Sequence, residues 1–239
     1  MPNWCNNHVS ISGNKDQMTA FILAAKTDSA DLSFANLFPC PQSLQDAPSG
    51  SDEIYYDIVY GNLEKIAGYG WIPDEIKNDR DALLTFVANR HGYHAGKGIG
   101  IADLIKYNLE TYGAKNWYDW CCKNWGTKWD IDGTGDRHGD EHASYYFDSA
   151  WSPPIEAFLK ISGDFPGLSF DLEYFEPGMA FCGRMTIENG EVVDEIDHNF
   201  SSNEELEAIV DSGFYDFVSS EAEAYLEMCR EDDEDQGAE

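Results

Sequence analysis

The segment "LSFDLEYFEPG", which begins at residue 168 and alternates as far as Tyr174, constrains the fold more than any other feature. Its apolar positions are Leu168, Phe170, Leu172 and Tyr174, and the polar positions between them are Ser169, Asp171 and Glu173. A period of two places all the apolar side chains on one face of a strand. A shorter alternation occurs in "HVSISG", where Val9 and Ile11 are followed by Gly13. The chain must therefore build a sheet with at least one covered face.

Further elements complete an α+β pattern. "TKWDID" and "SYYFDSA" are predicted to be short strands, and Asn189-Gly190 predicts a hairpin turn inside "MAFCGRMTIENGEVVDEID". One helix should follow the first strand, capped by Asn14 or Asp16, and another should begin after Pro153-Pro154. The predicted order is β-α-(insertion)-β-β-α-β-β-β. Its core is the split βαβ arrangement of ferredoxin-like folds.

We expect four segments along the chain. Residues 1–27 hold the first strand and helix of the ferredoxin-like domain, and residues 28–124 form a largely helical insertion rich in aromatic residues. Residues 125–200 complete the sheet. Residues 201–239 are predicted to be an acidic helical tail that is divided at Gly213. The last ten or so residues of this tail are predicted to be disordered.

The net charge of the chain limits the classes of partner that it can bind. The 239 residues hold 45 Asp and Glu against 15 Lys and Arg, a formal net charge of −30. Such a field repels nucleic acid and anionic membranes and attracts basic surfaces, over a screening length of about 8 Å at physiological salt. "AFCGRMTI" also lacks the basic and aromatic pattern of RNA-binding sheets. We therefore predict neither direct nucleic-acid binding nor membrane association.

The expected location is the cytoplasm. The N-terminus "MPNWCNNHVSISG" lacks the basic and apolar regions of a secretory signal, and no apolar run reaches the roughly 18 residues of a membrane span. The six cysteines are scattered and contain no C-x-x-C pair, which favours reduced thiols.

Three short motifs carry a family resemblance. "MPNWCNN", "NWGTKWD" and "FDSAWSPP" resemble the YubB-type ferredoxin-like family, whose members are carried on conjugative plasmids and prophages. The resemblance covers about residues 1–26 and 115–190. It implies a ferredoxin-like fold and an origin on mobile DNA, and it implies no reaction and no catalytic residues.

Four tryptophans lie at the junctions of predicted elements: Trp4, Trp125, Trp129 and Trp151. Aromatic residues at such junctions usually fill the end of a core, burying about 150–250 Å² each, so we expect core packing. An exposed ligand platform is the alternative. Lys128 is expected to lie along a strand or to pair with a carboxylate.

The loop from Asp130 to Glu141 fits the calcium-loop pattern D-x-D-x-x-G-x5-E. Its candidate ligands are Asp130, Asp132, Thr134 and Glu141. Thr134 stands where Asp or Asn is usual, and strands rather than helices are predicted on both sides. An exposed hairpin loop is therefore the main expectation. Calcium is the one cofactor considered.

The chain lacks the sequence motifs of common catalytic sites. It has no G-x-S-x-G, H-E-x-x-H or P-loop, so no catalytic residue is assigned and we predict that the protein is not an enzyme.

The C-terminal fifth of the chain concentrates the charge. From Glu188 to Glu239 there are nineteen acidic residues and one basic residue, Arg230. Carboxylates four residues apart on a helix lie about 6 Å apart along its axis, and DNA phosphates on one strand rise by about 3.4 Å each. A row of carboxylates can thus occupy part of a basic DNA-binding groove. The predicted partner-binding residues are Glu204, Glu205, Glu207, Asp211, Asp216, Glu221, Glu223 and Glu227.

The leading hypothesis is a non-enzymatic, DNA-mimic-type inhibitor of a host nucleic-acid-binding or defence protein, encoded by a mobile element. The first alternative is a small-molecule or calcium-binding protein that uses the Asp130–Glu141 loop or the aromatic insertion. The second is that the charge serves only solubility.

Overall fold

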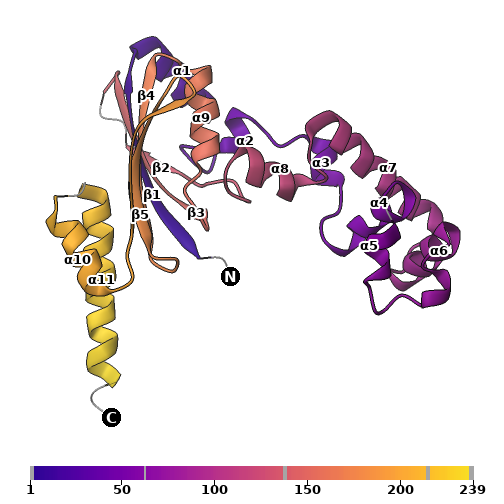
Figure 1. Cartoon of the computed structure of the whole chain (residues 1–239). Helices are drawn as coiled ribbons and strands as arrows, with labels where there is room; N and C mark the ends of the chain where they lie inside the picture. The colour runs from indigo at the N-terminus through magenta and orange to yellow at the C-terminus, as the bar shows by residue number, and fades with distance from the viewer. Residues whose placement is uncertain (1–2, 62, 137–138, 214–215, 237–239) are drawn as a thin grey trace. The chain divides into compact units, whose positions relative to one another are not determined.

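The computed structural model describes residues 3–61, 63–136, 139–213 and 216–236. The chain divides into two compact units (Figure 1). One consists of Met1–Pro39 and Lys123–Glu239, and the other is Cys40–Cys122. The segment 28–39, which the sequence places in the insertion, thus belongs to the unit that holds the sheet.

A six-stranded sheet with the order β2-β3-β1-β4-β5-β6 forms the first unit. β1 (Trp4–Gly13) pairs antiparallel with both β3 (His142–Ala150) and β4 (Leu168–Glu176). β3 and β4 therefore run parallel to each other with β1 between them, and α9 (Ile155–Asp164) connects them. This is a split βαβ unit, so the predicted α+β, ferredoxin-like class is confirmed.

The outer strands are β2 (Thr134–Asp136), β5 (Phe181–Glu188) and β6 (Glu191–Asn199). The turn between β5 and β6 is the predicted one, with φ of +50° at Asn189 and +81° at Gly190, as a type I′ hairpin requires. The predicted strand "TKWDID" is wrong, because 127–132 is irregular and β2 begins at Thr134. The Asp130 carboxylate binds backbone N–H groups of Phe34 and Ala35, which holds this segment away from strand pairing.

α1 (Lys15–Ala25) and α9 cover one face of the sheet, called here the closed face (Figure 1). Asn14 caps α1 by accepting hydrogen bonds from the backbone N–H groups of Asp16 and Gln17, so the first of the two predicted caps is confirmed. The alternating strand residues meet the helices here: Phe170 of β4 lies edge-on to Phe21 of α1 at 5.7 Å between ring centroids. Fully buried side chains of this core include Val9, Ile11, Phe21, Phe158, Phe170 and Leu172.

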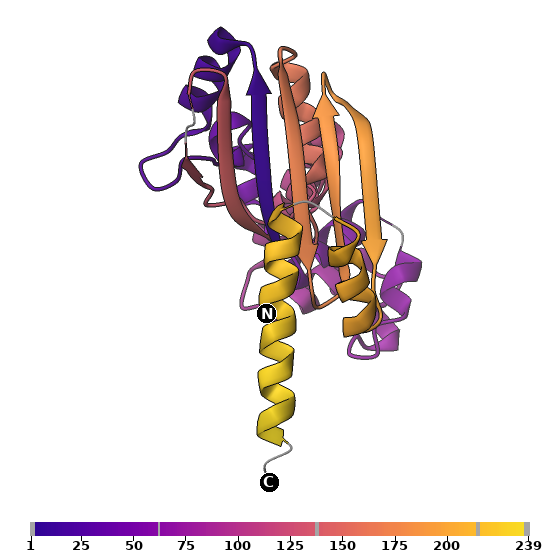
Figure 2. The ribbon, with the colours of Figure 1, turned by 90° about the vertical axis from the view of Figure 1, so that its left-hand side faces the viewer.

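α10 (Asn203–Asp211) and α11 (Asp216–Gln236) lie on the other face, called here the open face, where α11 crosses in front of the strands (Figure 2). Gly213, with φ of +85°, follows α10 at the predicted break. A separate apolar cluster attaches these helices to the sheet: Phe175, Cys182, Phe200, Leu206, Val218, Ala222 and Leu226.

α11 continues to Gln236, into the stretch that the sequence predicts to be disordered, and residues 237–239 lie outside the described chain. Glu has a high helix propensity, and adding a residue to an existing helix requires no new nucleus.

The second unit is helical and has its own core. Its elements are α3 (Gln42–Asp46), α4 (Ile54–Val59), α5 (Leu63–Ala67), α6 (Arg80–Arg90) and α7 (Ala95–Tyr112), with short 3₁₀ turns at Ser51–Glu53 and Asp74–Ile76. The short helix α2 (Phe34–Leu37) belongs to the first unit, and α8 (Trp117–Asn124) spans the boundary. The core of this second, helical unit includes the buried side chains of Tyr55, Ile58, Leu83 and Val87. A Cβ at Gly98 would lie 2.6 Å from the Tyr55 ring, so α7 needs a glycine there.

No helix in the described part of the chain is long and apolar enough to cross a membrane.

Candidate functional site

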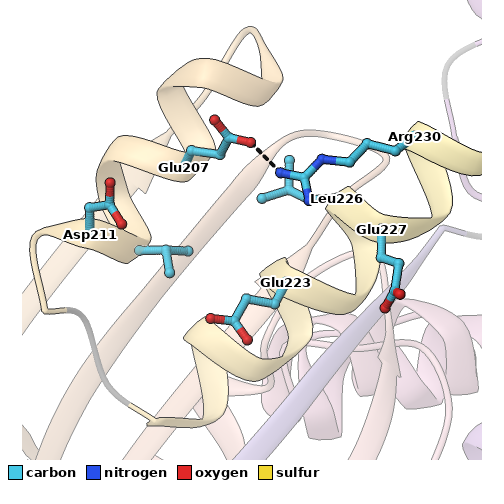
Figure 3. Close-up of a pocket in the computed structure, with 7 residues that line it drawn as sticks. Glu207, Asp211, Glu223, Leu226, Glu227 and Arg230 are labelled. Atoms are coloured by element: carbon cyan, nitrogen blue, oxygen red, sulfur yellow. Dashed lines mark hydrogen bonds and ion pairs between the residues drawn. The ribbon is translucent and has the colours of Figure 1, made fainter. Parts of the chain in front are cut away.

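The predicted acidic surface is built by α10 and α11. Ser202 caps α10 by accepting a hydrogen bond from the backbone N–H of Glu205 at 3.3 Å. Leu206 of α10 and Leu226 of α11 are buried in one cluster, which brings the two helices together. A groove of about 510 Å³ runs between them, called here the α10–α11 groove (Figure 3). It is lined by Glu207, Val210, Asp211, Glu223, Leu226, Glu227 and Arg230.

The α10–α11 groove carries a net negative charge. Glu207 and Asp211 lie one turn apart on α10, and Glu223 and Glu227 lie one turn apart on α11. Arg230 donates a hydrogen bond to Glu207 at 2.5 Å, and it is the one basic residue among the described groove residues. Both partners are largely exposed, so this ion pair is weak and easily exchanged for another partner.

The other predicted partner-binding residues lie elsewhere. Glu204 and Glu205 are in the first turn of α10, where carboxylates stabilise a helix. Hydrogen bonds from the backbone N–H and hydroxyl of Ser201 hold the pKa of Glu205 below its usual value. A local structural role therefore accounts for Glu205.

Asp216 and Glu221 line a different cavity, between α11 and the open face of the sheet. Glu221 is half-buried there, so it is not part of the exposed acidic surface beside the α10–α11 groove. Burial and the nearby Asp148 raise the pKa of Glu221. The helical periodicity of α11 gives no information about Asp148, because Asp148 belongs to strand β3 of the sheet.

Part of the acidic surplus is explained by the edge strand β6. All but one of its residues are exposed, and they include Glu191, Asp194, Glu195 and Asp197. Charged side chains on an edge strand prevent pairing with the edges of other sheets. Protection of the sheet edge therefore explains the carboxylates of β6, and it does not explain those of the α10–α11 groove.

The predicted calcium ligands are not brought together. The Asp130 carboxylate accepts hydrogen bonds from the Ser33 hydroxyl at 2.7 Å and the backbone N–H of Phe34 at 2.7 Å, at the start of α2. Thr134 pairs opposite Tyr146 in the sheet, while Asp132 and Glu141 are exposed. In the described ranges, no three His, Cys, Asp or Glu side chains are grouped to hold a metal ion. Asp130 instead serves as a long-range cap.

The tryptophan prediction is confirmed for Trp125 alone, which is 4% exposed and packs against Phe34 and Phe38. Exposed fractions at the other three sites are 46% for Trp4, 41% for Trp129 and 40% for Trp151. The Lys128 ammonium lies 3.7 Å from the Trp129 ring centroid and 4.1 Å from that of Trp151. Cation–π contacts with Lys128 therefore hold the rings of Trp129 and Trp151. The sequence suggested a carboxylate as a partner of Lys128, and the structure shows these two aromatic rings.

Two residues with unusual surroundings were not selected from the sequence. His8 of β1 and Glu173 of β4 project from the open face and are half-buried by α11. Burial lowers the pKa of His8 and raises the pKa of Glu173. The only sequence signal is their place at polar positions of two alternating strands.

Comparison with known proteins supports the fold assignment. Residues 124–213, from the end of α8 to Gly213 after α10, match a family model described as a ferredoxin-like domain in Api92-like protein. The crystal structure of protein api92 from Yersinia pseudotuberculosis aligns with 84% of this chain and 100% of that chain, at 16% identity and a TM-score of 0.38, which is too low to extend the likeness to the whole chain. No curated protein sequence matches the chain. The chain thus contains a ferredoxin-like domain, in agreement with its sheet topology.

Proposed function

We propose that the protein is a non-enzymatic interaction protein that uses the α10–α11 groove to bind a basic nucleic-acid-binding protein and to block its nucleic-acid site. The observation that carries the proposal is the pairing of two carboxylate rows, Glu207 with Asp211 and Glu223 with Glu227, on adjacent helices. Each row has a spacing of about 6 Å along its helix axis. Lys and Arg side chains that contact phosphates can reach such rows.

The electrostatics favour fast, salt-sensitive association. The field of a chain with net charge −30 attracts basic surfaces, and complementary charge increases association rates more than it increases affinity. Dense like charge also destabilises the folded chain. A recognition role supplies a reason to keep such charge in the groove.

The proposed setting is the cytoplasm of a bacterium that carries the gene on a plasmid or prophage. The motifs "MPNWCNN", "NWGTKWD" and "FDSAWSPP" support this setting through their resemblance to the YubB-type family. A defence nuclease is the kind of target that would suit a mobile element. Among the described residues, no group of three His, Cys, Asp or Glu side chains supports the alternative calcium-binding function.

The test is affinity capture of the tagged full chain from a bacterial lysate, with washes at low and high salt. We expect one basic nucleic-acid-binding protein, retained at low salt and released at high salt. The variant with Asp211→Lys, Glu223→Lys and Glu227→Lys should lose this partner. Purified partner should then bind DNA or RNA less well in the presence of the wild-type protein.

The matched control reverses three exposed carboxylates outside the groove, with Asp28→Lys, Glu75→Lys and Asp164→Lys. Both triple variants change the net charge by the same amount. Equal loss of the partner from both would show that net charge alone is recognised, and unchanged capture by the groove variant would refute the proposal.

A further inference from the structure

A cavity of about 680 Å³ lies between the open face of the sheet and the first turns of α11, and is called here the sheet cavity. Strands β1, β3 and β4 supply its floor, and α11 supplies its wall. Its lining residues are His8, Ser10, Tyr146, Glu173, Gly213, Asp216, Phe217, Ser220 and Glu221. It shares none of these residues with the α10–α11 groove.

Three rings make one side of the sheet cavity aromatic. His8 stacks on Tyr146 at 4.4 Å between ring centroids, with an angle of 29° between the planes. Phe217 lies 5.6 Å from His8 and 6.0 Å from Tyr146. Tyr146 is 55% exposed, so part of this aromatic surface is accessible to a ligand.

Two buried polar atoms in the sheet cavity have no hydrogen-bond partner in the described chain: Nδ1 of His8 and Oε2 of Glu173. The Glu173 carboxylate also accepts hydrogen bonds from the backbone N–H groups of Phe217 and Val218, which fixes it at the start of α11. Buried polar atoms are nearly always hydrogen-bonded in folded proteins. The described chain therefore leaves the polar groups of His8 and Glu173, which line the sheet cavity, incompletely satisfied.

The charge of the lining selects a cation. Glu173, Asp216 and Glu221 contribute carboxylates, and none of the described lining residues is Lys or Arg. Arg184 on the neighbouring strand is held by Asp171 in a two-point pair at 2.9 and 2.7 Å. Burial raises the pKa of both Glu173 and Glu221, although the charge of the nearby Arg184 partly offsets the effect at Glu173.

The spacing of these groups favours an organic cation over a metal ion. In the part of the chain that the structure describes, the acidic side chains do not converge as metal ligands must. A guanidinium is planar, stacks on aromatic rings and directs five N–H donors outward to separate acceptors. An ammonium is a compact charge and makes less use of a ring surface and spread carboxylates.

We propose that the sheet cavity binds a guanidinium group, which stacks on the exposed ring of Tyr146 and donates hydrogen bonds to Glu173 and Glu221. The guanidinium could belong to a free small molecule or to an arginine side chain of another protein. This site does not depend on the proposed function of the α10–α11 groove, because the two share no residue.

Isothermal titration calorimetry of the full chain tests the site with three probes: agmatine, N-acetyl-arginine amide and N-acetyl-lysine amide. We expect saturable one-site binding of the guanidinium probes, at least about tenfold tighter than the lysine probe. Tighter binding of agmatine would indicate a small-molecule ligand, and tighter binding of the capped arginine would indicate a side chain. No saturation by either guanidinium probe below about 10 mM, or equal binding of the lysine probe, would overturn the proposal.

Variants locate the binding. Glu173→Gln and Glu221→Gln should each weaken guanidinium binding by about tenfold or more, while the groove variant Asp211→Asn should leave it unchanged. Gln can still accept the backbone hydrogen bonds at the start of α11, and amide NMR spectra would verify the fold. If Glu173→Gln fails to fold, Glu221→Gln and Tyr146→Leu still test the site. Binding that survives the cavity variants and is lost with Asp211→Asn would refute the sheet cavity and leave the groove proposal standing.

Discussion

The two faces of the sheet use the same strands in opposite ways. On the closed face, β1 contributes the buried side chains of Val9 and Ile11 to the core. On the open face, His8 and Ser10 of the same strand line a polar cavity beside α11. The period of two along a strand therefore separates a region that stabilises the fold from a region that is free to bind.

The open face is also the less securely packed one. Its apolar cluster includes Phe175, Leu206 and Leu226, while the region near Glu173 holds unsatisfied polar atoms. Elements that bind ligands are commonly drawn from the less stable parts of a protein. We infer that α10 and α11 open at a lower free energy than the rest of the sheet unit.

The largest expected effect is on the closed face. Phe170 is fully buried and contacts the rings of Phe21 and Phe158, so Phe170→Ala should lower the free energy of unfolding by about 3–5 kcal/mol. Tyr146→Ala on the open face should cost about 1 kcal/mol or less. Urea unfolding measures both, and equal losses would contradict the difference between the faces.

The next effect is a local one. Leu206 is fully buried beneath α10, and Leu206→Ala should cost about 2–4 kcal/mol within the α10–α11 layer. Helical signal in circular dichroism should then fall at low urea, before the main transition of the sheet. A single transition shifted as a whole would show that the layer is not separable.

Two caps of similar chemistry should differ in reach. Asn14→Ala at α1 and Ser202→Ala at α10 should each cost about 1 kcal/mol for the capped helix. Amide hydrogen exchange should show faster exchange throughout the sheet for Asn14→Ala and faster exchange confined to α10 for Ser202→Ala. The same pattern of exchange in both variants would argue against two regions of different stability.

The smallest effect is on pH dependence. Because burial raises the pKa of Glu173 in the folded state, the folded chain binds its proton more tightly than the unfolded chain does. The resulting stability is complete below the unfolded pKa of about 4.3 and is lost as pH rises through the folded pKa. Wild type should therefore lose stability relative to Glu173→Gln as pH rises through this window, in parallel urea titrations. A difference that is constant with pH would contradict the assignment.

Local sequence patterns predicted much of the sheet, because strand alternation and turn residues are properties of short, continuous segments. Alternation identified β1 and β4, and Asn189-Gly190 identified the β5–β6 turn through the positive φ it allows. The candidate calcium ligands are not brought together, because the Asp130 carboxylate accepts a hydrogen bond from Ser33, 97 residues earlier in the chain.

Long-range packing also explains the residues that were missed. His8 and Glu173 belong to strands that are far from Glu221 in the sequence, and only the docking of α11 on the sheet makes the three residues neighbours. The tryptophan prediction failed at Trp129 and Trp151 because it took no account of Lys128 as a partner. Composition predicted an acidic surface, but it could not divide that surface between groove, cavity and edge strand.

The most direct test of a recognition face is to titrate the isotopically labelled full chain with a hexa-arginine peptide and to follow every assigned amide by NMR. If the open face recognises basic groups, amides of α10, α11 and the open-face positions of β1 and β4 should shift at low peptide concentration, and salt should weaken the effect. Amides of α1, α9 and the helical unit Cys40–Cys122 should stay unchanged. Shifts of equal size across all acidic surfaces, including the helical unit, would show that the charge is not organised for recognition.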